Sequence, residues 1–320
     1  MRKSLMYVNL FLLTGLLLTG ICCAKESTVP VNVFVSILPQ KYFVERVGGD
    51  LVNVAVLVGP GQSPATYEPR PRQMAELSKA KIFFRIGVPF EQSLMPKIES
   101  AFKGLTVVDT RKGISLRNMA EKHDHAHEGE DRPDGKGLRG EEHAENHKEE
   151  HHHEAGAPDP HIWLDPVLVK TQAKTVCDAL SNVDPQHAGT YRKNLEKFQS
   201  DLDMANDKIA KVLAPLKGKI VFVFHPAYGY FTDRYGLKQV AVETGGKEPT
   251  AGQLAELIDK AKRSGVKVIF VQPQFDRRNA ETIAKAISGV VVSLDPLSPD
   301  YLKNLNDMAS RMESSQALKK

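Results

Sequence analysis

The sequence predicts an α/β protein in which two similar lobes, each built on a parallel sheet, are joined by one long rigid helix. Short apolar segments alternate with helical patterns on both sides of residues 185–217, and one apolar stripe runs through 185–217 itself. The chain of 320 residues is also long enough for two domains of ordinary size. We expect a first lobe over 25–184, the linking helix over 185–217 and a second lobe over 218–320.

The first lobe contains four short apolar segments that predict buried strands, at 31–37, 51–58, 81–86 and 105–108. Helical patterns separate them, at 39–49, 71–79 and 89–102. Strands joined by helices pair in parallel, because a crossover needs a connection of helix length. After a less regular stretch, Asp165 is the predicted N-cap and Pro166 the first turn of a helix that runs to about Leu180.

The clearest periodic segment follows Asp184 and Pro185, which repeat the same start signal. Its apolar residues are spaced alternately four and three positions apart, so they share one face of a helix: Tyr191, Leu195, Phe198, Leu202, Ala205, Ile209 and Val212. A helix over 185–213 would be roughly 43 Å long, enough to join two lobes. The alternative is that the stripe forms a coiled-coil seam with a partner.

The second lobe repeats the alternation of the first. Apolar segments predict buried strands at 219–224, 238–242, 266–271 and 290–294. Helical patterns lie near 227–235, 250–264, 276–288 and 299–313. The same argument from connection length predicts a second parallel sheet.

Residues 1–24 are predicted to be a signal peptide that exports the protein to the periplasm. Arg2 and Lys3 precede an apolar run over 10–21, the usual layout of a secretory signal. A transmembrane span is the weaker interpretation, because a span needs about 20 apolar residues. Cleavage after Ala24 and lipid anchoring through Cys22 or Cys23 are both open.

Charge and cysteine content exclude some classes of protein. The formal net charge is +4, without a basic patch interleaved with aromatic residues, so we expect no nucleic-acid partner. Cys177 is the one cysteine beyond the leader, so no disulfide can form within the mature chain. Its Ala- and Val-rich helical surroundings predict a small buried side chain rather than a reactive thiol.

Eight of the eleven histidines lie in an acidic segment with few apolar residues, within 121–158. They are His123, His125, His127, His143, His147, His151, His152 and His153. Neutral imidazole binds zinc, copper and nickel, so this composition predicts a tract that collects metal ions. The alternative is a solvated, disordered loop whose histidines have no role in metal binding.

Three further candidate metal ligands lie next to predicted strands or helices. His225 directly follows the strand at 219–224, and Asp295 directly follows the strand at 290–294. His161 lies four residues before the N-cap Asp165. Open parallel sheets bind ligands beyond the carboxyl ends of their strands, so all three side chains are candidate metal ligands. The alternative is that the two histidines are structural and that Asp295 is a helix cap.

The sequence also resembles a known family, the zinc/manganese solute-binding proteins of ABC importers, and within it the zinc branch. The matching stretches follow the family order across nearly the whole chain: 61–69 (GQSPATYEP), 159–166 (DPHIWLDP), 224–231 (FHPAYGYF), 245–249 (GGKEP), 272–275 (QPQF) and 294–297 (LDPL). The resemblance implies two α/β lobes bridged by a long helix, with the metal site in the interlobe cleft.

The resemblance also implies a set of ligands. His161 and His225 match two family histidines, and Asp295 matches the carboxylate of the second lobe. Where the family has another histidine this chain has Ala65, which cannot coordinate a metal ion. Two imidazoles and a carboxylate are typical of zinc sites that keep an open position. Water, a histidine of the 123–153 tract or the nearby Glu68 are candidates for the remaining position.

Two nitrogen ligands and one carboxylate suit zinc better than manganese, which prefers oxygen. The resemblance implies a monomeric protein, not an enzyme, that captures Zn²⁺ as cargo and delivers it to an ABC permease and its ATPase in the inner membrane. The His-rich loop would be a low-affinity collector or sensor. Alternatives are a manganese or iron importer component, and a metal-binding adhesin or storage protein. A zinc-dependent hydrolase is disfavoured, because the sequence contains no zinc-protease helix motif.

Overall fold

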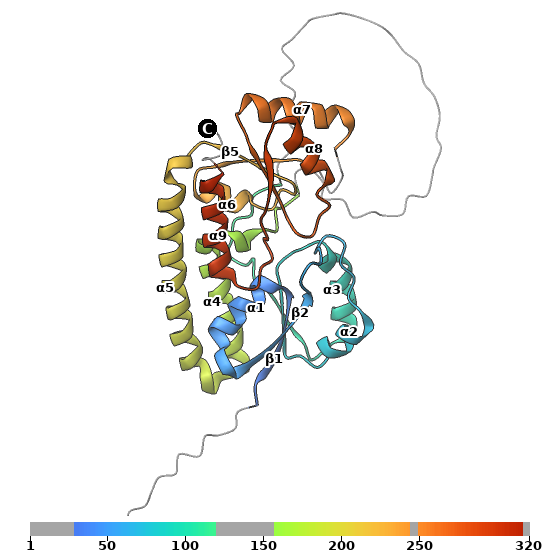
Figure 1. Ribbon diagram of the computed structural model, residues 1–320. Coiled ribbons are helices and arrows are strands. Elements are labelled where there is room, and N and C mark those ends of the chain that lie inside the picture. The colour runs from blue at the N-terminus through green and yellow to red at the C-terminus, as the bar shows by residue number, and fades with distance from the viewer. Residues whose placement is uncertain (1–28, 120–156, 244–248, 316–320) are drawn as a thin grey trace, which may run out of the picture.

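The computed structural model describes residues 29–119, 157–243 and 249–315, which form two lobes beside one long helix (Figure 1). Each lobe contains a four-stranded sheet, with strand orders β2-β1-β3-β4 and β6-β5-β7-β8. All neighbouring strands pair in parallel, and the second sheet repeats the order of the first. The fold class predicted from the sequence, two similar parallel-sheet lobes and a long helix, is confirmed.

Each of the four strands predicted for the first lobe is present. The elements are β1 (Val31–Ile37), α1 (Leu38–Gly48), η1 (Gly49–Leu51), β2 (Val52–Val58), α2 (Pro71–Leu77), β3 (Ile82–Arg85), α3 (Phe90–Ala101) and β4 (Thr106–Asp109). In β1, consecutive residues from Val33 to Ile37 are buried, although their side chains alternate between the faces of the sheet. The sheet is therefore covered on both faces, as parallel sheets are.

The linking region consists of η2 (Ile162–Leu164), α4 (Pro166–Val183), η3 (Pro185–His187), α5 (Ala188–Leu213) and η4 (Ala214–Leu216). Asp165 is the N-cap of α4, as predicted: its side chain accepts a hydrogen bond from Val167 N at 2.8 Å. The helical run begins at Pro185, where the sequence predicted it. Its first turn, Pro185–His187, is 3₁₀ and continues directly into α5, and the carboxylate of Asp184 just before it contacts the side chains of His187 and Tyr191.

The apolar stripe of α5 packs inside the chain rather than forming a seam for a partner. Tyr191, Phe198, Leu202 and Ile209 are fully buried. They face the helices α1, α4 and α9 (Tyr301–Ser314), which lie against α5. At 26 residues, α5 is about 39 Å long and runs along the side of both lobes (Figure 1).

The second lobe also contains its four predicted strands. Its elements are β5 (Ile220–Val223), α6 (Gly229–Arg234), β6 (Lys238–Ala241), α7 (Ala251–Arg263), β7 (Val268–Val271), α8 (Arg278–Ala286), β8 (Val290–Ser293) and α9. The last helix begins beside the first lobe, where the ring of Tyr301 lies 4.8 Å from that of Phe43 in an edge-to-face arrangement. Such a pair adds about 0.5–1.5 kcal/mol beyond the burial of its area.

Two predictions fall outside the residues that the structure describes. They are the signal peptide over 1–24, with Cys22 and Cys23, and nearly all of the His-rich loop. Cys177 is described and is buried, as predicted. Among the described helices, none combines the length and the apolar character needed to cross a membrane.

Candidate metal centre

A small cavity of about 30 Å³ lies between the two lobes. Its first-lobe wall includes Ala65 and Pro89, and its second-lobe wall includes His225 and Gln272. His161, which precedes η2, also lines it. A cavity needs only about 10–15 Å³ to hold one water molecule, so this one has room for an ion.

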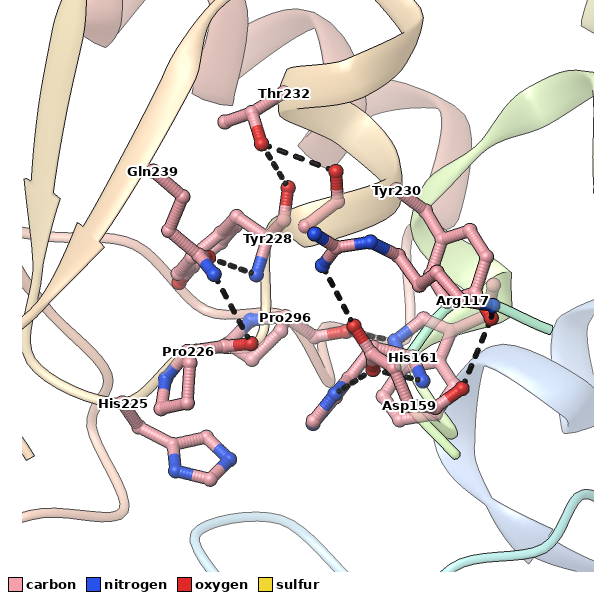
Figure 2. A network of polar contacts seen from close by, with 12 residues as sticks. Arg117, Asp159, His161, His225, Pro226, Tyr228, Tyr230, Thr232, Gln239 and Pro296 are labelled. Carbon is pink, nitrogen blue, oxygen red and sulfur yellow. Dashed lines mark hydrogen bonds and ion pairs between the residues drawn. The ribbon is translucent and has the colours of Figure 1, made fainter. Parts of the chain in front are cut away.

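His161 is held by the carboxylate of Asp159 (Figure 2). Oδ1 of Asp159 accepts from the backbone N of His161 at 3.0 Å and lies 2.7 Å from its ring Nδ1. Burial lowers the pKa of His161, although the charge of Asp159 opposes this effect. The imidazole is therefore neutral at neutral pH, the form that binds a metal ion.

His225 lies just beyond the carboxyl end of β5 and is held by a different carboxylate. The side-chain amide of Gln272 accepts from His225 N at 3.2 Å and donates to His225 O at 2.8 Å, which fixes the backbone. Ring Nδ1 lies 3.1 Å from Oε2 of Glu243, which follows β6. The ring of Phe275 stacks on the imidazole, with 4.9 Å between centroids.

The two imidazoles form one unit on the cavity wall. Their ring centroids are 5.3 Å apart, and the rings are inclined at 71°. In each ring Nδ1 is next to a carboxylate, which favours the tautomer with its proton on Nδ1 and a lone pair on Nε2. Metal-binding histidines in proteins are commonly oriented by such carboxylates.

Asp295, the third predicted ligand, is not on the wall of this cavity, although its neighbours Pro296 and Leu297 are. Its Oδ1 accepts from Gln274 Nε2 and from Leu297 N, both at 3.0 Å. Within residues 29–119, 157–243 and 249–315, no group of three or more His, Cys, Asp or Glu side chains is arranged to hold a metal ion. The structure brings the two histidines together, and Asp295 stays a predicted ligand.

Comparison with known proteins identifies the family. A model of the family described as "Zinc-uptake complex component A periplasmic" matches residues 33–315. The chain belongs to this family. It is 31% identical over 307 residues to the high-affinity zinc uptake system protein ZnuA of Brucella abortus, covering 91% of each chain. It is 28% identical to ZnuA of Yersinia pestis, covering 92% of each. A crystal structure of a ZnuA deletion mutant with zinc bound superposes with a TM-score of 0.77 at 35% identity, covering 90% of this chain and 98% of the other.

The first-lobe wall of the cavity carries Ala65, where the family resemblance implied a histidine. Ala65 does line the cavity, so the position faces the site even though its methyl group cannot bind metal. Glu68 is exposed and is not on the cavity wall. The eight histidines of the tract lie outside the described residues. Their part in a metal site stays a prediction.

The sequence reasoning missed the two carboxylates that hold the imidazoles. Glu243 lies just after the strand β6 of the second sheet. A position just after a strand was also the reason for choosing His225 and Asp295 as candidate ligands. Asp159 is part of a family stretch, but its role was not predicted. It is fully buried. Burial raises its pKa, but the hydrogen bonds from His161 and the charge of Arg117 bring it below the ordinary value, so Asp159 is ionised.

Proposed function

We propose that this protein captures Zn²⁺ outside the cytoplasm and delivers it to an ABC importer. The observation that carries the proposal is the pair of buried imidazoles, 5.3 Å apart on the wall of the interlobe cavity, each with a carboxylate at Nδ1. Membership of a family of zinc-uptake components supports it. So does the zinc-bound relative of similar fold.

His161 and His225 are the proposed nitrogen ligands, with Asp295 as the carboxylate that joins them. To bind, Asp295 would exchange its contact with Gln274 for the metal ion. Two nitrogens favour zinc over manganese, which prefers more oxygen ligands. Water, Glu68 or a tract histidine remains the candidate for the last position. Zinc is the cargo here, and no catalytic role is proposed for it.

The His-rich loop is proposed to be a low-affinity collector or sensor. Its eight histidines are interspersed with carboxylates and precede His161 closely in the chain. Bound zinc would be concentrated near the cavity without occupying it. The cargo would then pass to a permease and its ATPase in the inner membrane. We propose that the protein acts there as an exported monomer, either free in the periplasm or lipid-anchored through Cys22 or Cys23.

Metal stoichiometry tests both parts of the proposal. The mature protein is compared with a variant in which residues 121–156 are replaced by a Gly/Ser segment of equal length. After dialysis against zinc, the variant should keep one tightly bound ion and lose the additional weak ones. Loss of the tight ion as well would make a loop histidine a ligand of the main site. The mature protein is also dialysed against manganese. If it retained as much manganese as zinc, the assignment to zinc would be contradicted.

A further inference from the structure

Arg117 and Asp159 are neighbours across a short antiparallel pairing beside the cavity. Met119 N donates to Ala157 O, and Asp159 N donates to Arg117 O, both at 2.8 Å. Although these segments are far apart in the sequence, the pairing places the side chain of Arg117 beside Asp159. His161 follows Asp159 by two residues, so the same pairing also positions His161.

The carboxylate of Asp159 divides its oxygens between His161 and Arg117 (Figure 2). Oδ1 contacts His161, and Oδ2 accepts from Nη1 of Arg117 at 3.0 Å. The side chain of Asp159 is fully buried, so no solvent would replace a lost partner. Without Arg117, Oδ2 would lose the charged hydrogen bond that fixes the rotation of the carboxylate.

Helix α6 of the second lobe holds Arg117 from the other side. Arg117 Nε lies 3.0 Å from Oδ2 of Asp233. The hydroxyl of Tyr230 accepts from Arg117 N and donates to Asp159 O, both at 3.0 Å. A planar guanidinium can contact two carboxylates in fixed geometry, which a lysine cannot. The orientation of Asp159 therefore depends on the lobe that also carries His225.

Gly229, the first residue of α6, leaves the space that this arrangement needs. A Cβ at this position would lie 1.4 Å from Nη1 of Arg117 and 3.0 Å from Oδ2 of Asp159. The φ angle of Gly229 is not in the left-handed region, so glycine is needed for space and not for backbone conformation. A methyl group here would displace the guanidinium without removing any polar group.

We propose that Arg117 is a positioning residue for metal binding. It acts through Asp159 to hold the ring of His161 with its proton on Nδ1, which leaves Nε2 as the atom that binds the metal. Helix α6 sets the position of Arg117 through Asp233, Tyr230 and the space at Gly229. This inference rests on the proposed function, because it assigns His161 to zinc.

Zinc affinity of three single variants and one double variant tests the inference. Gly229→Ala and Arg117→Ala should each weaken binding about tenfold, the lower end of the effect of losing an outer-shell partner. Gly252→Ala is the matched control, at the second residue of α7 with open space around it, and should leave affinity unchanged. In the double variant, Gly229→Ala should add nothing, because Arg117 is no longer there to be displaced.

A second measurement separates positioning from a general loss of structure. Imidazole ¹⁵N shifts in the zinc-free protein should report the Nδ1-protonated tautomer of His161 in the wild type and a mixture of tautomers in Gly229→Ala. If Gly229→Ala fails to fold, Arg117→Lys, which keeps the charge but not the two-sided contact, should give a smaller share of the second tautomer and a correspondingly smaller loss of affinity. Thermal unfolding identifies which variants are folded.

The outcomes distinguish this inference from the proposed function. Wild-type affinity and an unchanged tautomer in Gly229→Ala and Arg117→Ala would overturn the inference and leave zinc capture intact. Additive losses in the double variant would also overturn it, since Gly229 would then act independently of Arg117. A wild-type protein that binds no zinc would end both proposals.

Discussion

The ring of His161 lies 5.3 Å from the ring of His225, although one precedes α4 and the other follows β5. Asp159 contacts the first ring and Glu243 the second, each at Nδ1. Both imidazoles are thus oriented before any metal ion arrives. For the proposed ligands this would favour tight capture, because preorganised side chains lose little freedom on binding.

Replacing one of these rings should remove most of the tight binding. His225→Ala should weaken zinc binding by more than the roughly 10- to 100-fold that loss of an outer-shell partner costs, since a direct ligand is lost. Competition with a chromophoric chelator measures the change. His187→Ala is the control, because His187 contacts Asp184 at the start of α5, away from the cavity. Equal affinities for both variants would rule out the assigned site.

Restoring the histidine that the family resemblance implies should tighten the site. Ala65 lines the cavity from the first lobe, so Ala65→His would bring a nitrogen ligand to the metal. We expect a gain of about tenfold, equivalent to about 1.4 kcal/mol, in a calorimetric titration. Thr66→His, at the exposed neighbouring position, should give no gain. An unchanged affinity in Ala65→His would mean that another group already fills the position.

The carboxylate behind His225 should contribute to affinity without touching the metal. Glu243→Ala removes the acceptor at Nδ1 and should weaken zinc binding about 10- to 100-fold. Glu243→Gln keeps an acceptor oxygen and should lose less. Glu256→Ala, at an exposed position on α7, is the control. If Glu243→Ala binds zinc as tightly as the control, Glu243 has no part in orienting His225.

Stability should depend on Asp184 at the start of α5. Its Oδ2 accepts from the hydroxyl of Tyr191, whose side chain is buried. Asp184→Ala leaves that hydroxyl without its acceptor and should lower the free energy of unfolding by about 1–3 kcal/mol in urea titrations. Asp178→Ala, on the exposed side of α4, should change it little. A similar small effect of both variants would contradict this role for Asp184.

The same carboxyl group predicts a pH dependence. Burial raises the pKa of Asp184, but hydrogen bonds from Tyr191 and His187 outweigh this and lower it below the ordinary value of 3.8. Because the folded-state pKa is depressed, the stabilisation is present above pH 3.8 and is lost as the pH falls through the lowered pKa. Urea titrations between neutral pH and about pH 3 should therefore bring the wild type closer to Asp184→Ala only at the acid end. A constant difference down to the lowest pH would be inconsistent with this origin.

Much of the fold could be predicted from local patterns. The eight strands, the N-cap Asp165 and the buried stripe of α5 all follow from the spacing of apolar residues and from start signals. The helical run that contains α5 begins at Pro185 as expected, but the spacing of apolar residues did not show that its first turn, Pro185–His187, is 3₁₀.

The site could be predicted only in part. His161 and His225 were found because one belongs to a recognisable stretch and the other ends a strand, and the structure brings both to one cavity. The sequence did not point to Arg117, because a single arginine before a His-rich segment belongs to no motif that indicates a role. Its contacts with Asp159 and Asp233 join three separate parts of the chain.

By itself the sequence determined the alternation of strands and helices, the parallel pairing of both sheets and the choice of two histidines as candidate metal ligands. These properties are encoded by neighbouring residues, through periodicity and connection length. Only the tertiary structure decided which carboxylate orients which imidazole, and that Asp295 contacts Gln274 rather than the cavity. Such contacts depend on the packing of distant segments, and the spacing of residues along the chain does not specify that packing.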